Sequence, residues 1–325
     1  METSGTLSIL HALLDSTDLT RIRGVNRHTR ECVRRIWLER TKFSCDAFFK
    51  TLSEEDRRDI HHLYGLYKLP TTWPEKLQTL TFHFRFQQAL TSLPAGLTHL
   101  ALGDCFIQQL WSGLLPSGLT HLTFGTYFNE SLVPGVLPTS LRYLTFGRCF
   151  NQPIMKNVLP TSLTHLIFDG IYFNQPIGIG VFPPGLTHLT FGPGFNQPIS
   201  TGVLPTSLTH LPFHGGGDYQ SAFNQAFEVG VLPSSLTHLT LGDGFNSPFS
   251  GGALPSGLTH LTFRQKFFSQ MERGVLPVGL SNYTICYRYR SMFTSIHSDS
   301  TWKSIVFPIL VLPASVGSRL ETGWM

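Results

Sequence analysis

The stretch PTSLTHLIFDGIYFNQPIGIGVFPPGLTHLTFGPGFNQPI, residues 160–199, decides the fold because it contains nearly the same segment twice. The pattern extends in both directions, and each copy starts at a proline. These anchors are Pro74, Pro94, Pro116, Pro138, Pro160, Pro183, Pro205, Pro233, Pro255 and Pro277. Most anchors are 22 residues apart, so ten copies of one short unit account for about two thirds of the chain. Such a regular internal period is typical of stacked repeat proteins.

The apolar residues of each copy define a short strand. They recur three, six and eight positions after the proline, as in Leu119, Leu122 and Phe124. The last two have the period of two that a β-strand requires. A unit of this length cannot bury its apolar side alone, so each strand must pair with the same strand of the next copy. The sequence therefore predicts a solenoid with a parallel sheet along one face.

A second motif, FNQPI, follows each strand in the central copies, for example at residues 150–154, 173–177 and 195–199. Together with the LPTSLTHL-like segment after it, this motif closely resembles the FNIP repeat, a relative of the leucine-rich repeat. The resemblance implies an α/β-type, leucine-rich-repeat-like solenoid over residues 74–286. It also implies a protein-interaction scaffold rather than an enzyme, and no catalytic constellation stands out in the sequence.

In six copies, an asparagine follows the phenylalanine that recurs in this motif. These residues are Asn129, Asn151, Asn174, Asn196, Asn224 and Asn246. An amide at a turn can bond the backbone of its own copy and of the next one. We therefore expect a structural asparagine ladder rather than a set of ligand contacts.

Histidines recur five positions after the proline, where the side chain should point away from the buried face. This row consists of His99, His121, Tyr143, His165, His188, His210, His238 and His260. One interpretation is a metal-binding or pH-sensing array, because neighbouring imidazoles resist simultaneous protonation. The favoured interpretation is a polar aromatic surface that binds a protein partner, because a linear row lacks the converging ligands of a zinc site. We expect neither a metal nor a cofactor.

Residues 1–42 have a different pattern, with apolar residues at helical spacing, and predict a small all-α domain. The leucine-rich start of this segment, the later Val25-Asn26-Arg27 and the final Trp37-Leu38 together resemble an F-box. The resemblance implies binding to a Skp-type adaptor of a cullin ligase through Leu10, Leu13, Leu14, Leu19 and Val25. The alternative is a helical cap on the solenoid. We expect a helical linker or N-terminal cap over residues 43–73 and a C-terminal cap or tail over residues 287–325.

Composition narrows the classes of function. The net charge is only +4, without the basic stripe of a nucleic-acid-binding protein, and no apolar stretch reaches the length of a membrane span. Five cysteines without a CxxC pair favour a reducing, intracellular compartment, with the cytoplasm (the host cytoplasm for a viral protein) as the expected location.

The expected function is that of an F-box-type substrate receptor, which presents a bound protein to an SCF-type ubiquitin ligase. The alternative is a repeat scaffold with no link to a ligase. Departures from the repeat consensus are the best predictors of partner specificity: Arg142, Tyr143, His214, Asp218, Tyr219 and Arg264.

Overall fold

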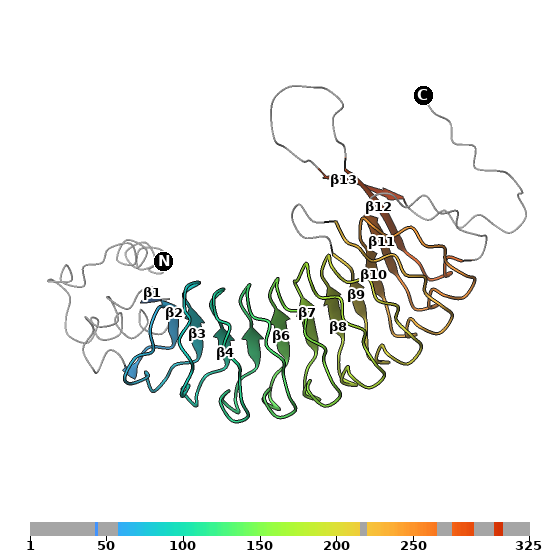
Figure 1. The fold of residues 1–325 in the computed structure, drawn as a ribbon. Coiled ribbons are helices and arrows are strands. Elements are labelled where there is room, and N and C mark those ends of the chain that lie inside the picture. The colour runs from blue at the N-terminus through green and yellow to red at the C-terminus, as the bar shows by residue number, and fades with distance from the viewer. Residues whose placement is uncertain (1–42, 45–57, 215–219, 265–274, 289–301, 308–325) are drawn as a thin grey trace, which may run out of the picture.

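The computed structural model of the chain describes residues 43–44, 58–214, 220–264, 275–288 and 302–307. The expected helical domain of residues 1–42, with its five proposed adaptor-binding residues, lies outside this part. Thirteen strands form one sheet in chain order. Figure 1 shows the strands side by side along the inner side of an arc, with the irregular segments on its outer side.

The strands are short and regularly spaced along the chain. They are β1 (Phe43–Ser44), β2 (His62–Leu66), β3 (Thr79–Phe82), β4 (His99–Ala101), β5 (His121–Thr123), β6 (Tyr143–Phe146), β7 (His165–Phe168), β8 (His188–Phe191), β9 (His210–Pro212), β10 (His238–Leu241), β11 (His260–Arg264), β12 (Asn282–Arg288) and β13 (Trp302–Phe307). The ten strands β3 to β12 each begin five residues after an anchoring proline. The predicted parallel solenoid of ten copies is therefore confirmed.

The sheet pairs equivalent residues of neighbouring copies. His165 of β7 lies opposite His188 of β8, and Leu166 lies opposite Leu189. A slip of one residue would turn the buried side chains outward, so the alternating pattern fixes this register. Each anchoring proline closes a turn, as where Leu119 N–H donates to the Pro116 carbonyl at 3.1 Å.

The core is one continuous apolar cluster behind the sheet. Leu119, Leu122 and Phe124 are at most 2% exposed, as their spacing predicted. The phenylalanine at this position of the motif is also buried in each copy where the structure describes it, from Phe86 to Phe245, and these rings stack along the solenoid with centroids about 6 Å apart, as between Phe128 and Phe150 at 6.3 Å. Each copy therefore completes the core of its neighbours.

Glycine follows most strands because the turns of successive copies lie very close together. A Cβ on Gly147 would lie 2.2 Å from the carbonyl oxygen of Gly125 in the preceding copy. Real Cβ atoms do not approach that closely, so the close stacking of these turns requires glycine here.

The expectation of a helical linker over residues 43–73 is wrong for the residues that the structure describes. β2 pairs in parallel with β3 and extends the sheet by one strand beyond the first anchoring proline. Leu63 and Leu66 are buried while Tyr64 is exposed, and Gly65 has a φ of 73° at the irregularity between them. This alternation and the positive φ suit a bulged strand and not a helix.

At the other end, β12 is longer than the other repeat strands and pairs with β13 in the antiparallel direction. Residues 302–307 thus lie beside the last repeat strand, within the segment expected to form a C-terminal cap or tail. Among the described residues, no helix has the length and apolar character needed to cross a membrane.

Candidate interaction surface

The predicted row of histidines forms a continuous stack on the side of the sheet opposite the core. We call it the aromatic ladder; its members are His99, His121, Tyr143, His165, His188, His210, His238 and His260, one at the start of each strand from β4 to β11. Consecutive ring centroids are 4.0–4.3 Å apart, and the rings are nearly parallel. The parallel register alone produces this stack, because it repeats one position at the spacing of neighbouring strands.

A threonine precedes each histidine of the ladder and fixes its ring. The Thr187 hydroxyl lies 2.9 Å from Nδ1 of His188 and 3.1 Å from the carbonyl oxygen of Thr164 in the preceding copy. The same pair of contacts recurs at Thr98, Thr120, Thr164, Thr209, Thr237 and Thr259. Each histidine between the two ends of the ladder is therefore held by a ring on both sides and by a threonine hydroxyl at its Nδ1 edge.

Packing in the stack disfavours the charged form of the imidazoles. Partial burial lowers the pKa of His188 below its ordinary value, and nearby His165 and His238 lower it further. The pKa values of His121, His165, His210 and His238 are lowered for the same two reasons, burial first. Burial and the neighbouring rings therefore favour the neutral form of these five imidazoles.

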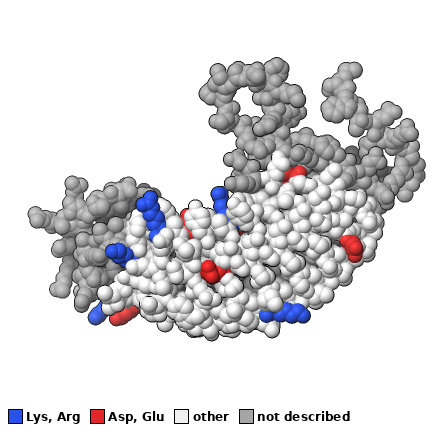
Figure 2. All heavy atoms as spheres, in the orientation of Figure 1, with Lys and Arg blue, Asp and Glu red and all other residues white. Residues whose placement is uncertain are grey.

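The second row of residues on this sheet face is uncharged in the strands β3 to β12, and Arg264 at the end of β11 lies beyond that row on the same face. This second row, two positions further along each strand, consists mostly of threonine, for example Thr123, Thr145 and Thr190. Figure 2 shows how sparse charged side chains are on the visible side of the solenoid. Among the described residues, no group of three or more His, Cys, Asp or Glu side chains is arranged to hold a metal ion.

The asparagines after the strands bridge consecutive copies. Oδ1 of Asn151 accepts a hydrogen bond from the backbone N–H of Asn174 at 3.0 Å and another from Nε2 of Gln175 at 3.1 Å. The same backbone contact joins Asn129 to Asn151, Asn174 to Asn196, Asn196 to Asn224 and Asn224 to Asn246. These amides satisfy the backbone of a turn that has no sheet partner.

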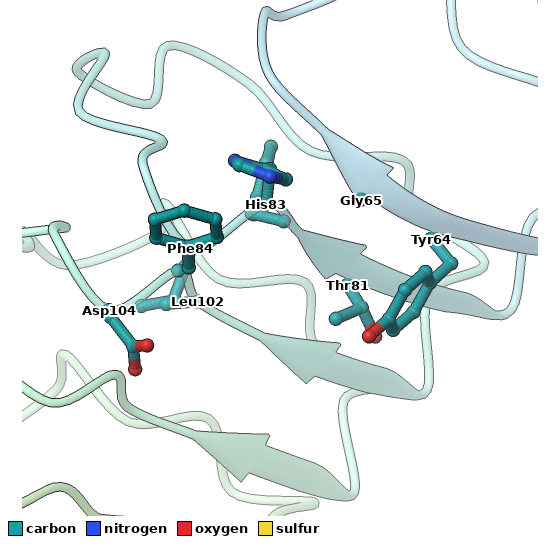
Figure 3. A pocket seen from close by; sticks show the side chains of 9 residues that line it. Tyr64, Gly65, Thr81, His83, Phe84, Leu102 and Asp104 are labelled. Carbon is teal, nitrogen blue, oxygen red and sulfur yellow. The ribbon is translucent and has the colours of Figure 1, made fainter. Parts of the chain in front are cut away.

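A pocket of about 410 Å³ opens near the ends of β2, β3 and β4 and was missed by the sequence reasoning. In Figure 3, Phe84 and Asp104 lie on one side of it and Tyr64 on the other. Its lining includes Gly103 and Asp104 of one copy and, at the corresponding positions of the preceding copy, His83 and Phe84. The departure of these residues from the repeat consensus was the available signal.

The residues expected to confer specificity do not form one cluster. Tyr143 belongs to the ladder and is 39% exposed, and Arg142 is exposed beside it. His214 lies further along the solenoid, where burial and nearby Arg264 lower its pKa while Asp169 raises it. Asp218 and Tyr219 lie outside the described residues.

Comparison with known proteins identifies the repeat. The FNIP Repeat profile matches residues 86–127, 128–170, 173–216, 223–266 and 245–282. No curated protein matches the chain.

Among solved structures, CroV588, described as a novel circular LRR protein, is 40% identical with a TM-score of 0.59. The similarity covers 72% of this chain but only 38% of CroV588, so the chain spans well under half of that protein's length.

Two bacterial proteins are more distant, each with 19% identity. An internalin (inlF) from Listeria monocytogenes has a TM-score of 0.45, and the match covers 74% of this chain and 69% of the internalin. YopM from Yersinia enterocolitica has a TM-score of 0.35, and the match covers 88% of this chain and 74% of YopM.

Proposed function

The chain belongs to the FNIP repeat family, and from this premise we propose that it is a non-enzymatic adaptor that binds a protein partner on the exposed face of its sheet. One observation carries the proposal: eight aromatic side chains stack without interruption across that face, and the seven histidines among them each contact a threonine hydroxyl. A rigid surface loses little side-chain entropy when a partner binds, which favours association.

The uncharged character of the face suits a protein partner better than a nucleic acid. Binding to phosphates depends on clustered Lys and Arg side chains, and neither row of the sheet face contains one between β3 and β12. The ladder residues are the proposed partner contacts.

We further propose that residues 1–42 act as an F-box and bind a Skp-type adaptor through Leu10, Leu13, Leu14, Leu19 and Val25. The support is the sequence resemblance described above. The chain would then work by proximity in the cytoplasm, holding a substrate protein close to a cullin ligase and raising the local concentration of its lysines. The alternative function is a scaffold whose N-terminal segment caps the solenoid.

A pulldown of the full chain with a purified Skp-type adaptor tests the ligase proposal. The comparison variant is Leu10→Asp/Leu14→Asp, with its fold checked by circular dichroism. Binding that is lost in the variant supports a ligase receptor. No binding by the unmodified chain would leave the scaffold function, and detected turnover by the purified chain would contradict the adaptor proposal altogether.

A further inference from the structure

We propose that the histidines of the aromatic ladder are all held in the tautomer that carries its proton on Nδ1, so the ladder presents a row of Nε2 hydrogen-bond acceptors. The fitting partner is a protein segment that offers donors without acceptors at its contact points, above all lysine side chains. This inference rests on the proposed binding role of the sheet face and specifies the chemistry of its partner.

The first argument comes from the threonine hydroxyls that contact the ladder histidines. Each threonine hydroxyl has one hydrogen and two contacts, one to a histidine Nδ1 and one to a carbonyl oxygen, as at Thr187. The carbonyl oxygen can only accept, so the hydroxyl must donate to it for that contact to be attractive. Nδ1 of the histidine must then donate to the hydroxyl oxygen. The opposite assignment would place the lone pairs of the two oxygens against each other at 3.1 Å.

The end of the ladder gives an independent argument. Nδ2 of Asn282 lies 2.7 Å from Nε2 of His260. An amide nitrogen is a donor only, so Nε2 of His260 accepts and its proton resides on Nδ1. Thr259 makes the usual hydroxyl contact with that Nδ1 at 2.9 Å. The contacts at Nδ1 and at Nε2 of His260 therefore indicate the same tautomer, with the proton on Nδ1.

In the part of the chain that the structure describes, the other histidines of the ladder have no counterpart of the Asn282 amide that donates to Nε2 of His260. Among the described residues, no other side chain donates to a ladder Nε2, and no Nε2 of the ladder is among the buried atoms without a partner. The acceptors of the six histidines from His99 to His238 are therefore open to solvent. The depressed pKa values keep the rings neutral, which leaves the lone pairs available. Acceptors without donors favour N–H groups over carboxylates, because a carboxylate would face lone pairs only.

Metal binding is the competing use of such lone pairs. The stacked rings are nearly parallel, with centroids 4.2 Å apart for His188 and both of its neighbours. Parallel lone pairs do not converge on one ion, which a multidentate site requires. Donation from a protein partner needs no convergence, since each acceptor can bind its own N–H group.

The tautomer can be measured without knowing the partner. Long-range ¹H–¹⁵N NMR correlations on the full chain at pH 8 distinguish a protonated Nδ1 from a protonated Nε2. We expect protonated Nδ1 at every ladder histidine. Thr187→Val should move His188 alone towards protonation at Nε2, while Thr190→Val, in the same strand but without a hydroxyl contact, should change nothing. Nε2-protonated rings in the unmodified chain, or no response to Thr187→Val, would overturn the proposal.

Binding of immobilised poly-L-lysine and poly-L-glutamate at pH 7.5 and physiological salt then tests the partner chemistry. The variant His165→Leu/His188→Leu/His210→Leu removes three acceptors, and Met155→Ser, an exposed change away from the ladder, is the control. We expect the triple variant to bind poly-L-lysine about tenfold more weakly than the control does. Poly-L-glutamate binding that depends on the three histidines, or poly-L-lysine binding that does not, would contradict the proposal. Neither assay involves the Skp-type adaptor, so failure of the ligase proposal is a separate result.

Discussion

Replacing Asn151 tests whether the asparagine ladder stabilises the fold through its acceptor oxygen. In the structure, Oδ1 of Asn151 accepts from Asn174 N–H and from Nε2 of Gln175, whereas no described residue accepts from Nδ2 of Asn151. Asn151→Ala removes both contacts. Asn151→Asp keeps an oxygen in the same place and removes only the unused donor, so the two variants separate the two halves of the amide.

The expected magnitude follows from the contacts. One hydrogen bond contributes a net 0.5–1.5 kcal/mol, roughly, to the free energy of unfolding. Asn151 is half-buried, so water can replace part of what Asn174 and Gln175 lose. We therefore expect Asn151→Ala to lower the free energy of unfolding by about 1.5 kcal/mol and Asn151→Asp by less than about 0.5 kcal/mol.

Urea unfolding followed by circular dichroism measures both effects, provided that the slope m stays constant. Met155→Ala in the same copy is the control, since Met155 is 64% exposed and should change the midpoint little. If the Asp and Ala variants lose equal stability, the acceptor oxygen is not the stabilising group. If neither loses stability, the ladder has no structural role.

Three further predictions concern the core, the turns and the ladder. Phe150→Ala should lower the free energy of unfolding by about 4 kcal/mol in urea, because the ring is 1% exposed and stacks between neighbouring copies. Tyr172→Ala, at a side chain that is 56% exposed, should lower it by under about 1 kcal/mol. Similar losses in the two variants would contradict the packing argument. Gly147→Ala should lower the thermal midpoint by roughly several degrees, because its Cβ would meet the Gly125 carbonyl. Gly178→Ala, with open space around it, should leave the midpoint unchanged. An unchanged midpoint in Gly147→Ala would be inconsistent with the close stacking of the turns. His121, His165, His188, His210 and His238 have lowered pKa values, so the unfolded chain takes up protons first on acidification. The free energy of unfolding should be constant above about pH 7.5 and fall as the pH drops through about 6.5, and a rise there would refute the assigned direction of the shifts.

The repeat made much of this fold predictable. A proline and a period-two apolar pair in each copy, with a glycine after the pair in several of them, place the strand, its buried face and its turn. Similar copies then leave one register that buries every leucine together. The exposed positions of the ladder residues were predictable for the same reason, because a repeat position that faces outward in one copy faces outward in every copy.

Features outside the repeat were less predictable. Residues 43–73 were expected to form a helical linker or N-terminal cap, whereas β2 pairs in parallel with β3 and so covers the edge of the first repeat strand. The pocket beside Phe84 is lined by residues of three neighbouring strands and the turns that follow them, and a repeat alignment does not reveal how differing copies fit together.

The sequence by itself determined the periodicity, the strand positions and the division into buried and exposed rows, because these depend only on spacing along the chain. The tertiary structure decided the stacking of the imidazoles at 4.0–4.3 Å, the hydroxyl contacts that orient them and the bridging of the asparagines. The ring stacks and the asparagine bridges join residues about 22 positions apart, and each threonine that contacts the next histidine also bonds a carbonyl in the preceding copy. Their geometry therefore exists only once successive copies lie side by side at the spacing of a parallel sheet.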